Sequence, residues 1–310
     1  MPLDFEVVPC DLCGSEQQET LLIGHDRLLG LPGSFQFVRC LNCGLIRQNP
    51  RPSRLSLVAY YPDSYPAFTR AIETETNALL QIDRRCGQLK RVRLIRRYSR
   101  RGRLLDVGCA TGSFVHELTR SGGWHALGVE PNRYACIYAR QMHKVNVICG
   151  TLSEASFPDQ AFDVVTMWNV LEHVPDPMRN LRQAYRVLRT GGFLIFAVPV
   201  ADSTLMHWFG QYWVEWDLPR HQFIFSREVL ETYLRSVGLR LVAVQAPLSE
   251  YRVFRMSLTN WGHDHVSSAR LRNALDVLVR FWPVRLIVTL ALRVLVSPHA
   301  SSIAVFVCQK

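Results

Sequence analysis

Residues 103–114 read RLLDVGCATGSF, an apolar run that ends in an acid and then breaks into small residues. The run at 104–107 predicts a short buried strand, and residues 114–120 suit a helix. Between them, Gly108 and Gly112 allow a tight turn that exposes backbone N–H groups. Because such a turn lets a ligand approach the backbone at the carboxyl end of the strand, the stretch predicts a cofactor site in an α/β fold. A plain strand-to-helix connection is the alternative.

The next predicted strand supports the cofactor interpretation. It covers residues 125–129 and ends in Glu130. An acid about twenty residues after the turn, at the end of the second strand of a βαβ unit, accepts hydrogen bonds from both hydroxyls of a ribose. The alternative role for Glu130 is that of a surface acid before Pro131.

Four stretches, in this order, resemble the motifs of class I S-adenosylmethionine-dependent methyltransferases. They are LLDVGCATGSF (104–114), GVEPN (128–132), FDVVTMWNVLEHVPDP (162–177) and VLRTGGFLIFAVP (187–199). The resemblance covers roughly residues 100–245. It implies a Rossmann-like α/β fold with a doubly wound, seven-stranded methyltransferase sheet, and S-adenosyl-L-methionine as the cofactor.

The resemblance also implies which residues hold this cofactor. Asp106 and the glycine turn frame the methionine end, Glu130 holds the ribose, and Thr151 and Leu152 lie near the adenine. Many members carry an acid beside the adenine where this chain has GTLS at 150–153, and Glu154 is the substitute. The implied cofactor residues are Asp106, Gly108, Cys109, Gly112, Glu130, Thr151, Leu152 and Asn169.

Two CxxC pairs, each followed by glycine, form the second strong signal. They supply four cysteines, Cys10, Cys13, Cys40 and Cys43. Paired knuckles of this kind bind Zn²⁺ through four thiolates, and a site closed by four cysteines is structural rather than catalytic. Disulfides are the alternative. Against them, the first fourteen residues lack the basic and apolar regions of a signal peptide, which predicts a reducing, cytoplasmic environment.

The net charge of +10 comes from one segment. Residues 84–103 contain ten Lys or Arg and no acid, so the rest of the chain has 26 basic and 26 acidic residues. Leu89, Val92 and Ile95 at helical spacing predict a helix with one apolar stripe. Three interpretations stay open: a solvated helix, a patch facing an anionic membrane or phosphorylated acceptor, and a nucleic-acid surface. Tyr98 is its single aromatic residue, which argues against base stacking and nucleic acid.

Residues 201–226 follow the predicted fifth strand and are rich in aromatic side chains. These side chains follow no regular period and suit the wall of an acceptor site. A zinc ribbon built on the two CxxC pairs, followed by a methyltransferase core, is similar to bacterial methyltransferases of sugars and secondary metabolites. In that group a stretch like DLPRHQFIFS (217–226) places a histidine near the acceptor, which implies His221 as general base. His173 is a second candidate, by its position after the strand at 162–168. A structural role is the alternative for each histidine.

The predicted organisation is a zinc ribbon at 1–55, a linker and basic helix at 56–102, and a methyltransferase domain at 103–310. The linker contains a loop-like stretch, YYPDSYP at 60–66. Its tyrosines either cover the cofactor or acceptor, or pack against the domain. An insertion at 249–302 separates the last two predicted strands of the sheet.

The insertion contains an apolar helix at 284–296, with Arg285, Thr289 and Arg293 on one narrow stripe. At 1.5 Å per residue this helix spans about 20 Å, which is shorter than the roughly 30 Å hydrocarbon layer. It is therefore predicted not to cross a membrane. A lid or core helix and a helix on the membrane surface both stay open.

Together these observations predict an enzyme that methylates a small-molecule, glycan or lipid-linked acceptor at oxygen or carbon. The predicted location is the cytoplasm, with peripheral membrane contact through 84–103 or 284–296. A zinc-ribbon protein that binds RNA or protein and senses the cofactor is the alternative. RNA methylation is a further one, although an N-P-P-Y sequence is absent after Trp168.

Overall fold

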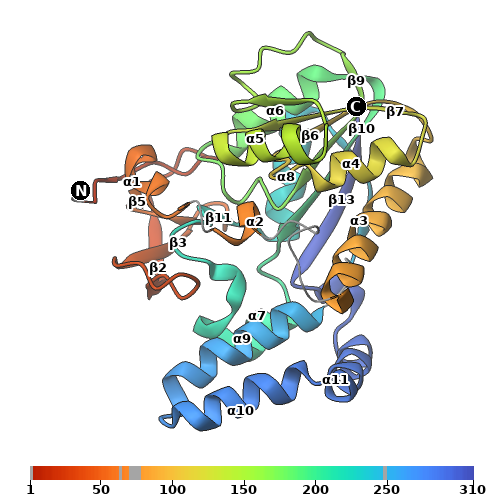
Figure 1. The fold of residues 1–310 in the computed structure, drawn as a ribbon. Helices are drawn as coiled ribbons and strands as arrows, with labels where there is room; N and C mark the ends of the chain where they lie inside the picture. Colours follow the sequence, from red (N-terminus) through yellow and green to blue (C-terminus); the bar gives the residue numbers. More distant parts are fainter. Residues whose placement is uncertain (1–2, 63–64, 70–77, 247–249) are drawn as a thin grey trace. The chain divides into compact units, whose positions relative to one another are not determined.

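The computed structural model describes residues 3–62, 65–69, 78–246 and 250–310 (Figure 1). The chain divides into two compact units, and each is built from three segments. The first unit comprises Met1–Tyr60, Val198–Leu230 and Gln245–Val305, and the second comprises Tyr61–Ala197, Glu231–Val244 and Phe306–Lys310. The predicted domain boundaries stay a prediction, because compactness is a different property from independent folding.

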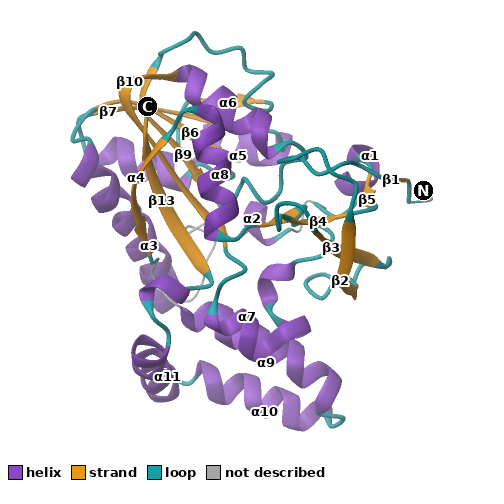
Figure 2. Ribbon diagram, turned by 180° about the vertical axis from the view of Figure 1, so that it is seen from behind, coloured by secondary structure: helices purple, strands orange, loops and turns teal. Residues whose placement is uncertain are grey.

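A seven-stranded sheet with the order β12-β13-β10-β9-β6-β7-β8 confirms the predicted methyltransferase architecture (Figure 2). Its strands are β6 (Gly102–Val107), β7 (Trp124–Glu130), β8 (Val147–Cys149), β9 (Phe162–Trp168), β10 (Leu188–Pro199), β12 (Arg240–Gln245) and β13 (Ile303–Gln309). Its helices are α3 (Ala78–Tyr98), α4 (Ser113–Arg120), α5 (Arg133–Met142), α6 (Pro177–Val187) and α8 (Arg227–Val237).

The direction of the strands makes this sheet mixed. Strands β8, β7, β6, β9 and β10 run parallel to one another. Strand β13 runs against β10. The N–H of Gly191 donates to the carbonyl of Lys310 at one end of this pair, and the N–H of Val200 donates to that of Ser302 at the other.

Strands β6 and β9 form the centre of the sheet because their sequences are apolar on both faces. Leu104 and Val164 are fully buried, as expected for a sheet covered on each side. The parallel register aligns Asp106 with Thr166. The carboxyl ends of β6, β7 and β9 therefore meet at one edge, where the predicted cofactor residues lie.

The first unit contains a four-stranded antiparallel sheet with the order β11-β4-β3-β2. Its strands are β2 (Gln18–Gly24), β3 (Phe35–Cys40), β4 (Ile46–Gln48) and β11 (Phe223–Ile224). Strand β11 comes from the stretch predicted to form the acceptor wall, and Phe223 pairs with Arg47 of β4. The N-terminal ribbon is therefore completed by residues that follow β10. A short pair, β1 (Phe5–Glu6) with β5 (Arg51–Pro52), lies beside α1 (Arg54–Val58).

The remaining helices of the first unit precede β11 or form the predicted insertion. The helices before β11 are α7 (Thr204–Phe209), η1 (Gly210–Tyr212) and η2 (Val214–Trp216). The helices of the predicted insertion are α9 (Glu250–His265), α10 (Ala269–Arg280), α11 (Trp282–Leu295) and η3 (Pro298–Ala300). Residue 249, where the predicted insertion begins, lies outside the described residues. Within the ranges that the structure describes, every helix is too short or too polar to cross a bilayer. Helix α2 (Pro66–Thr69) belongs to the second unit.

Candidate active site

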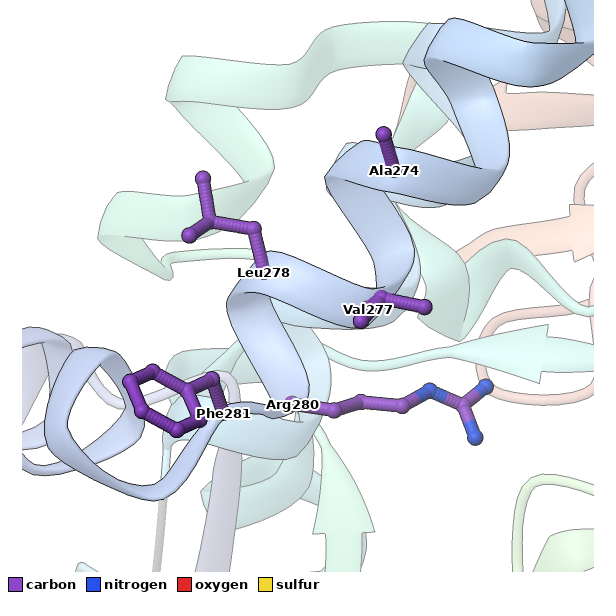
Figure 3. A pocket seen from close by; sticks show the side chains of 5 residues that line it. All are labelled: Ala274, Val277, Leu278, Arg280 and Phe281. Carbon is purple, nitrogen blue, oxygen red and sulfur yellow. The ribbon is translucent and has the colours of Figure 1, made fainter.

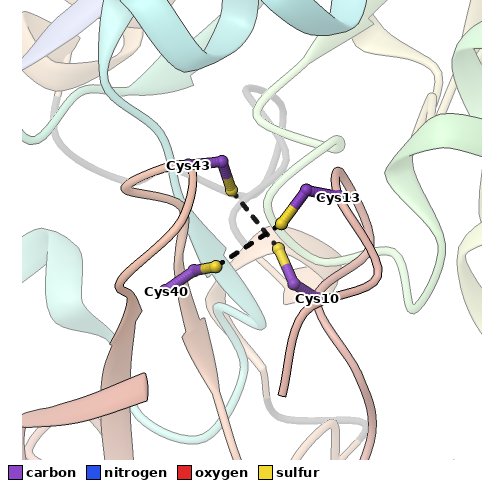
Figure 4. A group of neighbouring side chains, drawn as sticks. All are labelled: Cys10, Cys13, Cys40 and Cys43. Atoms are coloured by element: carbon purple, nitrogen blue, oxygen red, sulfur yellow. Dashed lines mark hydrogen bonds between the residues drawn. The ribbon is translucent and has the colours of Figure 1, made fainter. Parts of the chain in front are cut away.

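The four cysteines of the two CxxC pairs converge in the first unit (Figure 4). The Sγ atoms of Cys10 and Cys43 are 3.4 Å apart, those of Cys13 and Cys40 are 3.6 Å apart, and all four lie within 4.8 Å of one another. A tetrahedral zinc ion with Zn–S distances of about 2.3 Å requires S–S distances of about 3.8 Å. The donor set therefore fits Zn²⁺ in type, number and spacing.

The glycine after each pair closes its knuckle. The N–H of Gly14 donates to the carbonyl of Cys10, and that of Gly44 donates to the carbonyl of Cys40. Both glycines have a left-handed backbone, with φ of 71° and 76°, which residues with a side chain rarely adopt. The CxxCG pattern is thus the local cause of the convergence of the thiols.

In the second unit, Glu130 holds the glycine turn to the end of β7. Its Oε2 accepts the N–H of Ala110 at 2.9 Å, and its Oε1 accepts the N–H of Asn132 at 2.9 Å. Ala110 has φ of 45°, so the turn passes through a left-handed residue that is not glycine. A carboxylate has about four acceptor sites, so Glu130 retains acceptor capacity for ligand hydroxyls.

The two glycines of the turn admit no side chain. A Cβ at Gly108 would lie 2.5 Å from Cγ2 of Val170, and one at Gly112 would lie 2.8 Å from Cγ2 of Val145. Both glycines also have positive φ, 69° and 77°. The backbone of the turn therefore stays bare, as a ligand that contacts it requires.

Asp106, at the end of β6, is a buried acid. Burial raises the pKa of its carboxyl to about 7, although the Thr166 hydroxyl donates to it at 2.7 Å and the charge of Arg91 lowers the pKa. Burial also raises the pKa of Glu130, against the two N–H donors that it accepts. The site therefore holds two buried carboxyls whose ionisation a bound cation would favour.

Arg91 of α3 reaches this edge of the sheet, which the sequence analysis missed. Its guanidinium lies over the Trp168 ring, 4.7 Å from the ring centroid. Burial lowers the pKa of Arg91, and the charge of Asp106 opposes that shift. Trp168 itself has a buried Nε1 that lacks a hydrogen-bond partner among the residues the structure describes. The spacing of four residues from Arg91 to buried Ile95, which lies on the predicted apolar stripe, was the available signal.

Tyr61 brings the linker to the residues after β9. Its hydroxyl lies 2.9 Å from Nδ1 of His173, and the rings of Tyr61 and Tyr65 meet edge to face at 5.2 Å. Asp63 and Ser64 of the same loop lie outside the described residues. The structure thus brings together His173 and the linker tyrosines within the second unit.

The other predicted cofactor residues have various surroundings. Leu152 is buried, and the N–H of Thr151 donates to Glu154 at 2.8 Å, so this acid caps the loop. Asn169 has φ of 56°, and its N–H donates to the carbonyl of Ala197. Cys109 is buried, and burial raises the pKa of its thiol, which makes it an unreactive packing residue.

His221 belongs to the first unit, where it is buried. Its Nδ1 lies 2.6 Å from the carbonyl oxygen of Glu215, which only accepts hydrogen bonds, so Nδ1 carries a proton. Nε2 is 3.9 Å from Oδ2 of Asp217, beyond hydrogen-bond distance. A neutral histidine in this tautomer is able to accept a proton at Nε2.

Two tryptophans of the predicted acceptor wall form part of the core instead. Trp213 and Trp216 are buried, and their rings meet edge to face at 5.6 Å. Trp216 also packs against Phe37 of β3, with ring centroids 5.1 Å apart. The irregular spacing of these residues follows from two short 3-10 helices, η1 and η2, which a search for helical or strand periods does not find.

A comparison with protein families identifies the family of the chain. The sequence model of a family described as a methyltransferase domain matches residues 80–244, which is more than half of the chain. The chain belongs to the class I S-adenosylmethionine-dependent methyltransferases. The match includes the glycine turn, Glu130 and Arg91, so this family assignment covers the buried edge described above.

Individual methyltransferases resemble part of the chain. A demethylmenaquinone methyltransferase of Listeria welshimeri is 35% identical over 99 residues, which cover 29% of this chain and 42% of the relative. A ubiquinone biosynthesis O-methyltransferase of Klebsiella pneumoniae is 33% identical over 100 residues, covering 31% and 41%. The chain thus spans about two fifths of the length of these relatives. A methyltransferase structure from Archaeoglobus fulgidus superposes with a TM-score of 0.51 at 19% identity, covering 81% of this chain and all of the other, and supports the fold.

Proposed function

We propose that the chain transfers a methyl group from S-adenosyl-L-methionine to a small-molecule, glycan or lipid-linked acceptor. The observation that carries this proposal is the pair of hydrogen bonds by which Glu130 joins the glycine turn to the end of β7. These two hydrogen bonds hold the backbone of the glycine turn beside Glu130, the acid that would accept the ribose hydroxyls.

The residues at this edge suit each part of the cofactor. Asp106 would hold an ammonium or sulfonium charge, Arg91 would hold a carboxylate, and Glu130 would hold the ribose. Trp168 offers an N–H donor. When bound, S-adenosyl-L-methionine supplies a methyl group on a sulfonium, which is already an activated leaving group. The protein therefore mainly has to align the two reactants, and such alignment is worth about 7–11 kcal/mol.

The names of the two relatives support the small-molecule acceptor. Both name quinone biosynthesis or a quinone, which is neither RNA nor protein. We extend this acceptor class to the present chain as part of the proposal. Methylation at oxygen or carbon requires removal of a proton from the acceptor.

We propose His221 as the general base, with His173 as the second candidate. In its neutral form His221, protonated at Nδ1, carries a lone pair on Nε2. His173 is bound at Nδ1 by Tyr61, which orients its ring. A proton-transfer residue contributes about 10²- to 10⁴-fold in rate.

The His221→Ala substitution is expected to lower kcat by about 10²-fold or more and to leave cofactor affinity unchanged. His207→Ala is the matched control, because His207 also lies in the first unit with Nδ1 bonded to a backbone carbonyl, that of Ser203. Turnover is measured with the acceptor that labelling of cell extracts reveals, and melting checks that both variants fold. Full turnover of His221→Ala would move the assignment to His173.

The proposed activity is tested by supplying methyl-labelled S-adenosyl-L-methionine to the full chain with extracts of its source cells. The products are separated into small-molecule, lipid, polysaccharide, RNA and protein fractions. Label that appears in the first three fractions with the wild type and not with Glu130→Ala would support the proposal. Label confined to RNA or protein would overturn the acceptor class. Cofactor binding without label in any fraction would favour a cofactor-sensing role.

Cofactor affinity is expected to rise with pH as Asp106 ionises. Burial raises the pKa of Asp106 to about 7, so its carboxyl is mostly protonated at lower pH. A cation beside the carboxylate favours its ionised form, so binding releases a proton and strengthens as pH increases. For a pKa of about 7, the Kd falls by up to about tenfold between about pH 6 and pH 8.

Titration calorimetry measures this dependence, with Asp106→Asn as the comparison. The variant cannot ionise at this position, so its Kd should be nearly independent of pH over the same range. An equal slope in wild type and variant would contradict the role of Asp106 and point to Glu130, whose pKa burial also raises.

We further propose that the four cysteines bind one structural Zn²⁺ ion. The spacing of the thiols supports this assignment, and the closed set of four ligands excludes a substrate from the metal. Thiolates persist in a reducing environment, which is consistent with the predicted cytoplasmic location.

A further inference from the structure

Helix α10 presents an apolar stripe to solvent. Leu271, Leu275 and Leu278 follow one another at spacings of four and three residues, which places them on one face, and all three are exposed. The buried residue of this helix, Val279, follows Leu275 by four residues and lies at one edge of the stripe. In a surface helix of a soluble protein the apolar stripe normally faces the core and the polar face is exposed. In α10 the apolar stripe is exposed instead.

Helix α11 also exposes an apolar face. Its buried Leu292, with Val288 packed beside it, contributes to the core of the first unit, so one face of the helix is already occupied. The opposite face is also apolar: Ile287, Leu290 and Val294 are exposed, Ile287 by 65% and Val294 by 85%. The core of the unit therefore leaves a second apolar face uncovered.

The corner between the two helices is aromatic. Phe281 is 55% exposed and Trp282 is 68% exposed. Beside the corner lies an apolar concavity of about 550 Å³, lined by Ala274, Val277, Leu278, Arg280 and Phe281 (Figure 3). Four of these side chains project from α10, and Phe281 follows it directly.

The charge of this segment selects among the partners that would cover an apolar face. Residues 269–296 contain five arginines and one acid, Asp276. That acid already pairs with Arg280 at 2.8 Å and with Arg255 at 3.4 Å. A second copy of the chain would bring the same arginines together across the interface. An anionic lipid surface would supply the opposite charge and an apolar layer next to it.

We propose that α10 and α11 form a membrane-binding face that lies in the headgroup region of an anionic bilayer. The exposed leucines and Ile287 enter the boundary of the acyl chains, and Arg270 and Arg293 contact lipid phosphates. Phe281 and Trp282 lie at the level where aromatic rings favour the interface between lipid and water. The inference is independent of the proposed enzyme activity, because it concerns only binding of the chain to lipid.

Vesicle flotation of the full chain tests this proposal. The probes are vesicles of phosphatidylcholine alone and of phosphatidylcholine with about one third phosphatidylglycerol. The double substitution Trp282→Ser with Ile287→Ser removes two exposed apolar side chains. The matched control is Leu55→Ser with Val58→Ser in α1 of the same unit, where these residues are 87% and 65% exposed.

Wild type and control are expected to bind the anionic vesicles at least about tenfold more tightly than neutral ones, with affinity falling as salt is added. The double variant, with both substitutions in α11, should bind anionic vesicles at least about tenfold more weakly than wild type, while its melting temperature stays the same. Vesicles of brominated lipid should quench less fluorescence in Trp282→Phe than in wild type.

Three outcomes would overturn the proposal. The first is a wild type that fails to float with anionic vesicles. The second is a double variant that binds as tightly as the wild type. The third is a dimer in the absence of lipid that the double variant dissociates, which would assign this face to a second copy of the chain.

Discussion

A Cys40→Ser chain is expected to lose the proposed zinc ion and to unfold the four-stranded sheet of the first unit. Cys40 ends β3, and β3 is the strand that pairs with both β2 and β4. Apparent binding free energies of structural zinc are about 10–16 kcal/mol, whereas whole domains are stable by about 5–15 kcal/mol. Loss of the ion would therefore remove a free energy comparable to the whole stability of a domain.

The measurements are zinc content by atomic emission and melting followed by circular dichroism. Cys149→Ser serves as the matched control, because Cys149 is an exposed free thiol in the second unit. A strong chelator added to the wild type should reproduce the effect of Cys40→Ser and leave a second melting transition in place. One equivalent of zinc in Cys40→Ser, with unchanged melting, would contradict the assignment.

The Glu130→Ala substitution is expected to weaken cofactor binding by at least about 100-fold. Glu130 carries two functions, since it fixes the turn through Ala110 and accepts the ribose in the proposed complex. Charge-assisted hydrogen bonds contribute about 1.5–3 kcal/mol each, and about 1.4 kcal/mol corresponds to a factor of ten. The loss of two such bonds therefore accounts for the expected change.

Calorimetric titration with S-adenosyl-L-methionine measures this loss. Glu130→Gln keeps one carbonyl acceptor and should fall between wild type and alanine. Asp159→Ala is the control, because Asp159 is a largely exposed acid of the same unit that pairs with Arg186. Wild-type affinity in Glu130→Ala would reject the ribose site. The melting curve of Glu130→Ala, measured separately, distinguishes the loss of a ligand contact from unfolding of the glycine turn.

The parallel part of the fold could be predicted because its signals are local. Each strand of the βαβ unit is an apolar run that ends at a polar residue, as with Asp106 and Glu130, and the glycine turn fixes the connection. The CxxCG knuckles are equally local, since the glycine after each pair supplies the backbone shape. Their geometry follows from a few adjacent residues.

The remaining features depend on residues that lie far apart in the sequence. Strand β11 has two residues, and its strand identity comes from pairing with β4 rather than from its own pattern. Trp213 and Trp216 are similar, because partners such as Phe37 on a distant strand make them core residues. Arg91 was hidden among other basic residues, and only the packing of α3 distinguishes it from its neighbours.

The pairing of β4 with β11 has a consequence for synthesis on the ribosome. Gln48 of β4 bonds through its side chain to the carbonyl of Pro219, 171 residues later, and its backbone N–H bonds to Gln222. At about 5–20 residues per second, the nascent chain waits roughly ten to thirty seconds before this partner emerges. Throughout that interval one edge of the cysteine-bound sheet is open to other strands, which is a hazard for aggregation. Expression of residues 1–60 alone would make that interval permanent.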